Sequence, residues 1–196
     1  MCGGIIRVLI WIVASVLLWR SLKRSMIKKH KLQIMLFILF ELLLPVVLYC
    51  WWFENLFVTF SSPEAVYHYT KVGEIDSIIE GEVSDLVISW NADKSRDYTI
   101  VKKNIDGWKI SPFFKQRTVD QKYAEHILLS VEHYDNSQDY YVIVMYTGAN
   151  LIKIEDNRGS SFAASLDADG KSYTYFAYVE DYNEQYQIFI NGELIN

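Results

Sequence analysis

The chain has 196 residues, of which 51% are hydrophobic and 22% charged, and a formal net charge of −5. Residues 1–53 hold seven Lys/Arg and one acid, a net +6, whereas residues 54–196 hold twelve Lys/Arg and twenty-three acids, a net −11. This split excludes a uniform soluble globule. The acidity of the second part argues against nucleic acid as a partner, because phosphates would repel it.

Two long apolar segments open the chain. Gly3–Trp19 reads GGIIRVLIWIVASVLLW, and Leu32–Trp52 reads LQIMLFILFELLLPVVLYCWW. Each is close to the roughly 20 residues that an α-helix needs to cross the ~30 Å hydrocarbon core. We therefore predict a transmembrane hairpin over residues 1–53. A cleaved signal peptide is the alternative for the first segment, but its basic cluster follows the apolar stretch and no small-residue cleavage site is evident.

The loop between these segments, residues 20–31, contains six Lys/Arg and no acid. Lys and Arg are retained on the cytoplasmic side of a membrane. We therefore expect a multi-pass protein of the plasma membrane with two helices, a cytoplasmic loop and both termini outside. The lipid bilayer is its first expected partner.

Glu41 is an acid inside the second apolar segment. A carboxylate near the middle of a bilayer costs about 3 kcal/mol on insertion scales, so it takes a partner or stays protonated. In an antiparallel hairpin Glu41 lies opposite about residue 10, one helical turn from Arg7. Three interpretations stay open: an Arg7–Glu41 pair, a protonated Glu41 bonded within its own helix, and contact of Glu41 with another membrane protein.

A connector, residues 54–62, is expected to lead into a helix start at Ser61-Ser62-Pro63-Glu64. A serine side chain accepts from the first amides, proline suits the first turn, and glutamate favours the positive end of the helix dipole. The pattern predicts a short helix over Pro63–Tyr69.

The remainder is rich in short β-branched and aromatic runs bounded by turn residues. Strands are predicted at Ile75–Glu80, Asp85–Trp90, Tyr98–Lys103, Trp108–Ile110, Ala124–Tyr134, Tyr140–Thr147, Leu151–Ile154, Ser172–Glu180, Gln185–Ile190 and Glu193–Ile195. Turns are predicted at Asn91–Asp97, Asp106-Gly107, Asp135–Asp139 and Asn191-Gly192. We expect a mainly antiparallel, β-rich α+β extracytoplasmic domain over residues 63–196. The polar stretch Pro112–Asp120 divides the strands, so two subdomains (63–111 and 121–196) and one continuous sheet or sandwich both remain open.

No catalytic or metal-binding pattern stands out in the sequence. His68, His126 and His133 form no H-E-x-x-H motif, and no cysteine follows Cys50. Asp167-Ala168-Asp169-Gly170 matches only part of a calcium loop and indicates an Asp-Gly turn. We expect no catalytic residue, metal or cofactor.

Thirteen of the fourteen tyrosines lie in residues 54–196. Tyrosine forms strands well and is enriched where surfaces bind proteins or peptides. Tyr173 and Tyr175 point to one face of their predicted strand. They are a candidate exposed aromatic patch, with membership of the core as the alternative.

Four short stretches, Ile79–Glu82, Leu86–Trp90, Gly107–Ile110 and Tyr186–Glu193, resemble small surface modules of uncharacterised Gram-positive bacterial proteins. The resemblance implies a place at the cell surface and carries no chemistry. The sequence therefore predicts a membrane-anchored, non-enzymatic extracytoplasmic protein that binds another membrane or envelope protein. An accessory or immunity-type subunit, contacting a larger membrane complex through the hairpin, is the alternative. An envelope hydrolase is less favoured.

Overall fold

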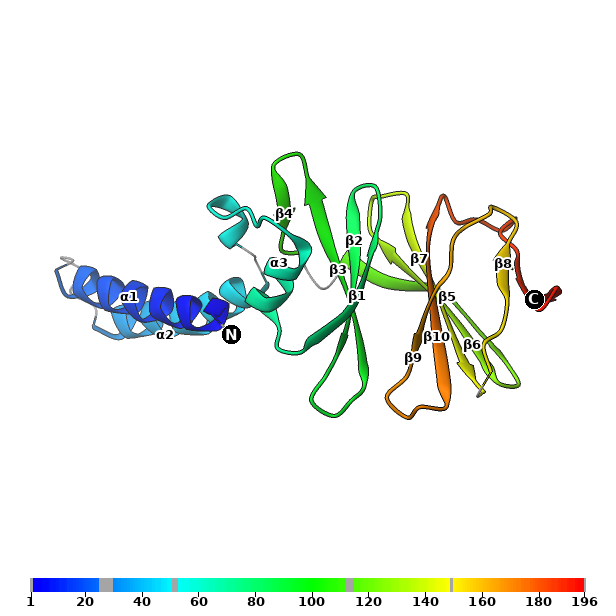
Figure 1. The fold of residues 1–196 in the computed structure, drawn as a ribbon. Helices are drawn as coiled ribbons and strands as arrows, with labels where there is room; N and C mark the ends of the chain where they lie inside the picture. Colours follow the sequence, from blue (N-terminus) through cyan, green and yellow to red (C-terminus); the bar gives the residue numbers. More distant parts are fainter. Residues whose placement is uncertain (1, 25–29, 51–52, 112–114, 149, 196) are drawn as a thin grey trace.

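The computed structural model describes residues 2–24, 30–50, 53–111, 115–148 and 150–195. Two apolar helices, α1 (Cys2–Arg24) and α2 (His30–Cys50), form a hairpin that projects from a β-rich domain (Figure 1). Ile5–Arg24 and Lys31–Leu48 are long and apolar enough to cross a membrane, and Leu22 is the one residue of these two described spans that is buried inside the protein.

Two short helices join the hairpin to the strands: the 3-10 helix η1 (Phe53–Leu56) and the α-helix α3 (Pro63–Thr70). The predicted start of α3 is confirmed, because Ser62 is its N-cap and its Oγ accepts a hydrogen bond of 3.3 Å from the Ala65 amide. Val66 and Tyr67 of α3 are buried, so this helix packs on the domain by one face.

The described strands form three antiparallel sheets. Sheet A has the order β1-β2-β3-β4, sheet B the order β5-β6-β7-β10-β9, and sheet C the order β12-β11-β8. The strands are β1 (Glu74–Glu80), β2 (Ser84–Trp90), β3 (Arg96–Asn104), β4 (Gly107–Lys109), β5 (Gln116–Ala124), β6 (Ile127–Tyr134), β7 (Asp139–Thr147), β8 (Ile154–Asp156), β9 (Ala163–Leu166), β10 (Ser172–Glu180), β11 (Ile188–Ile190) and β12 (Glu193–Ile195).

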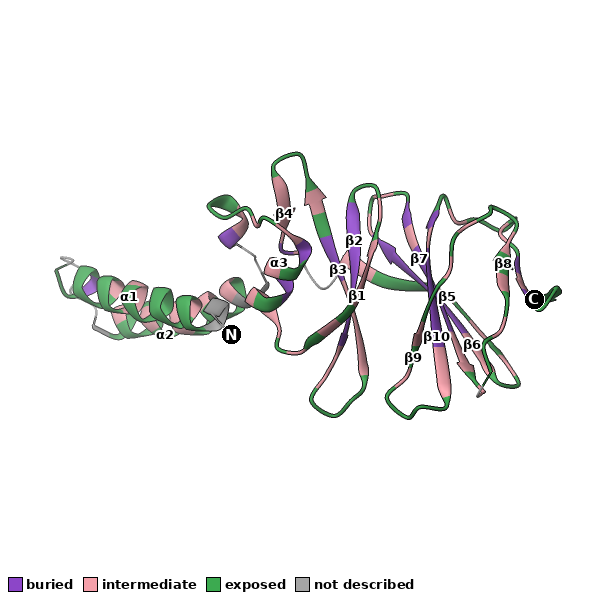
Figure 2. Ribbon diagram, viewed as in Figure 1, coloured by how far each residue is buried: buried purple, intermediate pink, exposed green. Residues whose placement is uncertain are grey.

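The domain is a stack of four layers: α3, sheet A, sheet B and sheet C (Figure 1). Three clusters of buried side chains fill the spaces between them, and Figure 2 shows the buried positions concentrated along the middle of sheets A and B. One cluster joins α3 to sheet A, the next joins sheets A and B, and the last joins sheets B and C. Residues 63–111 and 121–196 thus fall largely in different sheets that share a core; whether they count as two subdomains stays a prediction.

Alternation along the strands assigns each side chain to a layer. In β2, Val87 packs towards α3, whereas Leu86 and Ile88 pack towards sheet B. In β7, Ile143 packs towards sheet A and Val142 towards sheet C. Because successive side chains point to opposite faces, a strand between two covering layers has to be apolar almost throughout.

Several predicted strand bounds were wrong. Pro112–Asp120 was expected to be a separator, but Gln116–Ala124 is β5, the edge strand of sheet B. Ala124–Tyr134 was expected to be one strand, but Glu125 and His126 form the turn between β5 and β6. Edge strands tolerate polar residues on both faces, so β5 lacks the apolar alternation that marks the inner strands.

Three further differences concern short strands. β9 (Ala163–Leu166) was not predicted, because four small or exposed residues give no periodic signal. β8 and β11 are shorter than predicted and begin three residues later than Leu151 and Gln185, respectively. The turn at Asn191-Gly192 is confirmed, since both residues have positive φ between β11 and β12.

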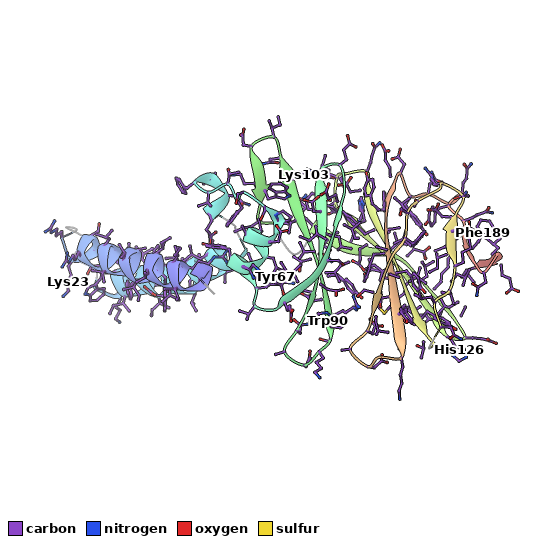
Figure 3. The ribbon with its side chains drawn as sticks, in the orientation of Figure 1. Lys23, Tyr67, Trp90, Lys103, His126 and Phe189 are labelled. Atoms are coloured by element: carbon purple, nitrogen blue, oxygen red, sulfur yellow. The ribbon has the colours of Figure 1, made fainter. Side chains whose placement is uncertain are left out.

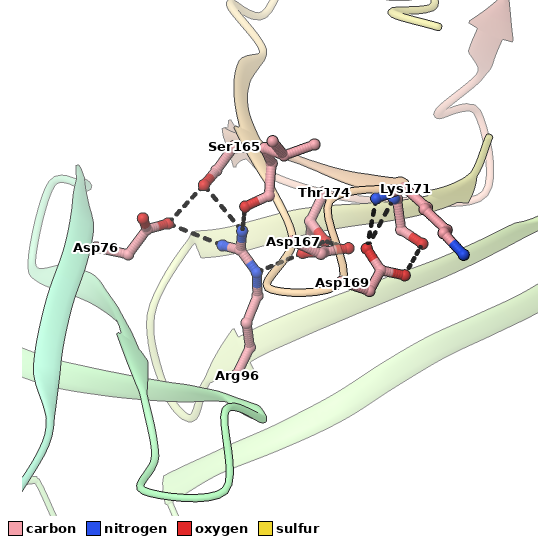
Figure 4. Close-up of polar contacts among 9 residues, drawn as sticks. Asp76, Arg96, Ser165, Asp167, Asp169, Lys171 and Thr174 are labelled. Atoms are coloured by element: carbon pink, nitrogen blue, oxygen red, sulfur yellow. Dashed lines mark hydrogen bonds and ion pairs between the residues drawn. The ribbon is translucent and has the colours of Figure 1, made fainter. Parts of the chain in front are cut away.

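Arg96 connects sheets A and B at one end of β2 and β3 (Figure 4). Its guanidinium donates to Asp76 of β1 (2.8 Å), to Asp167 beyond β9 (2.6 Å) and to Ser165 Oγ (2.8 Å). It also lies 4.1 Å from the centre of the Trp90 ring. The Arg96 side chain is only 6% exposed, so its charge is held almost wholly by these partners.

Replacement of Arg96 tests this connection. Arg96→Ala leaves Asp76 and Asp167 without their shared cation, and we expect the free energy of unfolding to fall by about 3–5 kcal/mol. Arg96→Lys keeps the charge but not the planar set of guanidinium donors, so its free energy of unfolding should lie between those of Arg96→Ala and wild type. Urea unfolding of the full chain in detergent, followed by circular dichroism, measures this.

Lys153→Ala is the matched control. Lys153 pairs with Glu155 at 2.8 Å, but the two side chains are 70% and 52% exposed. Such surface pairs contribute about 0–1 kcal/mol. A loss in Arg96→Ala no larger than that in Lys153→Ala would show that Arg96 does not hold the sheets together.

Candidate functional site

An ion pair joins the helical hairpin to the connector. Arg7 of α1 donates from Nε to Glu54 Oε1 (2.7 Å) and from Nη2 to Glu54 Oε2 (3.3 Å). The Glu54 side chain is 4% exposed and that of Arg7 is 15% exposed. This two-pronged geometry fixes the orientation of both groups, so α1 and η1 are held together at the end of the hairpin next to the domain.

The connector continues the edge of sheet A. Asn55 binds the backbone of Ile110 in both directions, with Oδ1 accepting from the amide (2.9 Å) and Nδ2 donating to the carbonyl (2.8 Å). Phe60 and Trp108 exchange two backbone hydrogen bonds of 3.0 Å each. The hairpin is therefore attached through an ordered segment that belongs to the sheet.

Glu41 accepts a hydrogen bond of 2.9 Å from Trp11 Nε1. This contact agrees with the prediction that Glu41 lies opposite about residue 10 in the hairpin. Of the three open interpretations, the Arg7–Glu41 pair is not formed within the described part of the chain, because Arg7 pairs with Glu54, which lies beyond the apolar segment. The second oxygen of Glu41, Oε1, is buried and has no hydrogen-bond partner among the described residues.

The candidate aromatic patch does not lie on the surface. Tyr175 is 4% exposed and belongs to the cluster between sheets B and C, and Tyr173 is half-buried against the same cluster. The Ile152 amide donates to Tyr175 Oη at 2.8 Å. The alternative, membership of the core, describes Tyr175, because sheet C, made of very short strands, covers this side of β10.

A cleft of about 440 Å³ lies between α3, β3, β5 and β6. Its apolar lining comes from Val66, Ile100, Val101 and Ile110. Its polar lining comes from Thr70, Lys71, Thr99, Ser111, Gln116, Arg117, Thr118 and Glu132. The backbone of Ile110 is also the group that Asn55 binds. The connector and the cleft thus both contact Ile110, which directly follows β4.

Hydrogen bonds hold the inner polar groups of the cleft in place. Glu132, only 9% exposed, accepts from Thr118 Oγ1 (2.7 Å) and from Ser130 Oγ (3.2 Å). Gln116 accepts from the Ile100 amide (2.9 Å) and donates to the Tyr98 carbonyl. The cleft therefore presents a fixed carboxylate and amide beneath a rim that carries Lys71, which pairs with Asp97, and Arg117, which pairs with Asp135. Such a mixture of donors and acceptors suits a polar ligand.

The three histidines of the domain lie on separate elements. His68 is exposed on α3, and His126 is exposed in the β5–β6 turn at the far end of the domain from Tyr67 (Figure 3). His133 is buried, stacks on Tyr140 and has Nδ1 3.2 Å from the Asp139 carbonyl. Among the described residues, no three His, Cys, Asp or Glu side chains form a group that could hold a metal ion.

The predicted Asp-Gly turn is present at Asp169-Gly170. The Asp169 carboxylate accepts from the amides of Lys171 (2.8 Å) and Ser172 (3.0 Å), as Figure 4 shows. The backbone hydrogen bond from Lys171, followed by that from the Ser172 hydroxyl, lowers the pKa of Asp169. This acid stabilises a turn.

Two aspartates are buried where the β1–β2 turn meets the neighbouring strands. Asp139, fully buried, accepts from the Val83 amide (3.0 Å), from Ser84 Oγ (2.7 Å) and from Tyr178 Oη (3.1 Å). Asp85, 1% exposed, accepts from Trp108 Nε1 and lies 4.0 Å from Lys103 Nζ. Burial raises the pKa of Asp85 against the opposing effects of Trp108 and Lys103.

Sequence reasoning missed both the cleft and the Arg7–Glu54 pair. Glu54 lies two residues after the second apolar segment, and an acid there is a signal for a partner at the end of the first. The cleft has no such signal, because its lining comes from residues 66 to 132 and needs the edges of sheets A and B side by side.

Comparison with known proteins gives no relative. No family model matches the chain, and neither the curated proteins nor the solved structures include a match. The resemblance to bacterial surface modules stays a prediction, and the function has to be argued from the geometry.

The raised pKa of Asp85 predicts a pH dependence of stability. The unfolded carboxyl ionises near 3.8 and the folded one at higher pH, so between these values the folded state binds more protons. Stability from this group is then present below pH ~4 and lost as pH rises through the folded pKa. Asp85→Asn lacks this loss, so its stability relative to wild type should rise with pH, by at most about 1.4 kcal/mol per pH unit.

Urea unfolding between about pH 4 and about pH 7 measures this difference. Asp93→Asn is the control. Asp93 is exposed, and hydrogen bonds from Ser95 lower its pKa, so its contribution changes only below that range. A difference between Asp85→Asn and wild type that stays constant with pH would contradict the prediction.

Proposed function

We propose that the chain is a membrane-anchored extracytoplasmic binding protein. Its two apolar helices cross the plasma membrane, with the basic loop on the cytoplasmic side and both termini outside. Its β-rich domain holds a polar segment of another envelope or membrane protein in the cleft between α3, β3, β5 and β6. The role is non-enzymatic.

The fixed connection between anchor and cleft carries this proposal. Arg7 holds Glu54, the next residue Asn55 holds the Ile110 backbone, and Ile110 lines the cleft. A simple tether needs only a flexible linker. An ordered connector gives the cleft a set position above the membrane, which suits a protein that meets its partner there.

The basic loop supports the proposed orientation. Arg20, Lys23 and Arg24 lie at the end of α1 far from the domain, and Lys31 begins the apolar part of α2. Positive residues are retained on the cytoplasmic side, which leaves the acidic domain outside.

Photo-crosslinking in cells tests binding in the cleft. A photoreactive residue in place of Arg117, on the rim, should give a discrete crosslinked product with another protein. The same residue in place of Lys153 should not, although that side chain is as accessible: it is 70% exposed, against 62% for Arg117. Equal products from both positions, or none from Arg117, would count against the cleft as the binding site.

A labelling control checks the side of the membrane. In a chain with Cys2→Ser and Cys50→Ser, an impermeant thiol reagent on intact cells should label Ser161→Cys and leave Ser21→Cys unlabelled. The reverse pattern would put the domain in the cytoplasm.

The accessory-subunit function is supported by one observation, the Glu41 oxygen without a partner among the described residues. A neighbouring membrane helix could donate a hydrogen bond to it, and such a bond contributes about 0.6–2 kcal/mol in a membrane. If so, Glu41→Leu should reduce co-purification of the partner from membranes while the domain stays folded. Trp11→Phe, which removes the internal donor, is the control and should keep the partner. Unchanged co-purification in Glu41→Leu would leave the hairpin as an anchor alone.

A further inference from the structure

Three consecutive apolar residues are exposed at the end of η1. Phe57 is 82% exposed, Leu56 is 69% exposed and Val58 is 39% exposed. They follow α2 by only a few residues. Contiguous exposed apolar side chains on a folded protein mark a contact surface.

The polar groups around this turn are already bonded within the protein. The Phe57 and Val58 amides donate to the Glu54 carbonyl at 3.0 and 2.8 Å. Lys109 Nζ donates to the carbonyls of Asn55 (3.0 Å) and Val58 (2.7 Å). Backbone groups without partners oppose entry into lipid, and here two amides and three carbonyls are satisfied.

The two polar side chains of the segment are engaged as well. Glu54 is buried against Arg7, which balances its charge, and Asn55 binds both backbone groups of Ile110. The segment thus turns its polar groups inwards and its apolar side chains outwards. Such an arrangement lowers the desolvation cost of burying the turn in an apolar medium.

The position of the turn in the fold indicates that the apolar medium it contacts is lipid. Figures 1 and 2 show η1, with an exposed stretch after it, at the end of the domain from which the hairpin projects. Glu54 is bonded to Arg7 of α1, so η1 lies level with the outer part of that helix. In a chain anchored by the hairpin, this is the level of the lipid headgroups.

We propose that Leu56, Phe57 and Val58 enter the outer leaflet and form a second contact with lipid beside the helical hairpin. This inference rests on the proposed membrane anchor. Large apolar side chains at the headgroup boundary bind through their buried area. Two separate contacts, joined through Glu54 and Asn55, fix the tilt of the β-rich domain and set the direction in which the cleft opens.

Spin labels at three positions test the contact in the full chain. The protein, with Cys2→Ser and Cys50→Ser, is placed in phosphatidylcholine vesicles and labelled at Phe57→Cys, at Leu39→Cys in α2 or at Leu151→Cys. Leu151 is 66% exposed and precedes β8, at the end of the domain far from the helices (Figure 1). Relaxation by oxygen reports lipid, and relaxation by a water-soluble nickel chelate reports solvent.

The label at Phe57→Cys should be relaxed more by oxygen than by nickel, as at Leu39→Cys, and the label at Leu151→Cys should show the reverse. Nickel accessibility at Phe57→Cys equal to that at Leu151→Cys would overturn the second contact while the anchor stands. Low accessibility to both reagents, or spin–spin broadening between copies, would overturn it in favour of a protein partner. Nickel accessibility at Leu39→Cys would remove the anchor and this inference with it. A label at Leu56→Cys repeats the measurement at a second exposed position.

Discussion

The whole domain depends on two strands that are apolar on both faces. In β2 the apolar run Leu86–Ile88 is buried, and in β7 the run Tyr141–Val144 is buried. Burying a large apolar side chain contributes about 1.5–3 kcal/mol, and this contribution is lost if the side chain faces water. A strand of this kind therefore needs another layer on each of its two faces. Sheets A and B can cover only one face of each other. The outer faces therefore need α3 on one side and sheet C on the other, and the four-layer stack follows.

Apolar contacts alone do not fix how sheet A is aligned on sheet B. Buried polar groups fix this alignment. Arg96 joins sheets A and B at the end of β2 that includes Trp90, and Asp139 joins them at the end that includes Ser84. Each replaces its lost hydration with several direct hydrogen bonds, the condition under which a buried charge is tolerated. The sheets are thus aligned by charged contacts at both ends of the same strand, with apolar side chains between them.

The sequence predicted the parts of the structure that have a strong local signal. Apolar length predicted the two helices, Ser62 and Pro63 predicted α3, and the aromatic and β-branched runs predicted the inner strands. β5 escaped because an edge strand has few apolar residues to report it. An Arg7–Glu41 pair was one of three possibilities left open, on helical level alone. The fold gives Arg7 the acid at the end of the apolar segment, and Glu41 takes the neutral donor Trp11. A neutral donor in mid-helix avoids placing a second charge in the apolar region.

The connector explains why the helical hairpin and the β-rich domain are not physically separable. β4 is only three residues long, and the edge of sheet A beyond it would expose unpaired backbone groups, which invite pairing with other chains. Phe60 and Asn55 occupy that edge through bonds to Trp108 and Ile110. A domain cut before residue 61 would lose these partners and uncover the Ile110 amide at the border of the cleft. The segment that leads from the hairpin therefore also completes the sheet, so a force or tilt applied to the hairpin reaches the cleft through hydrogen bonds of the folded domain.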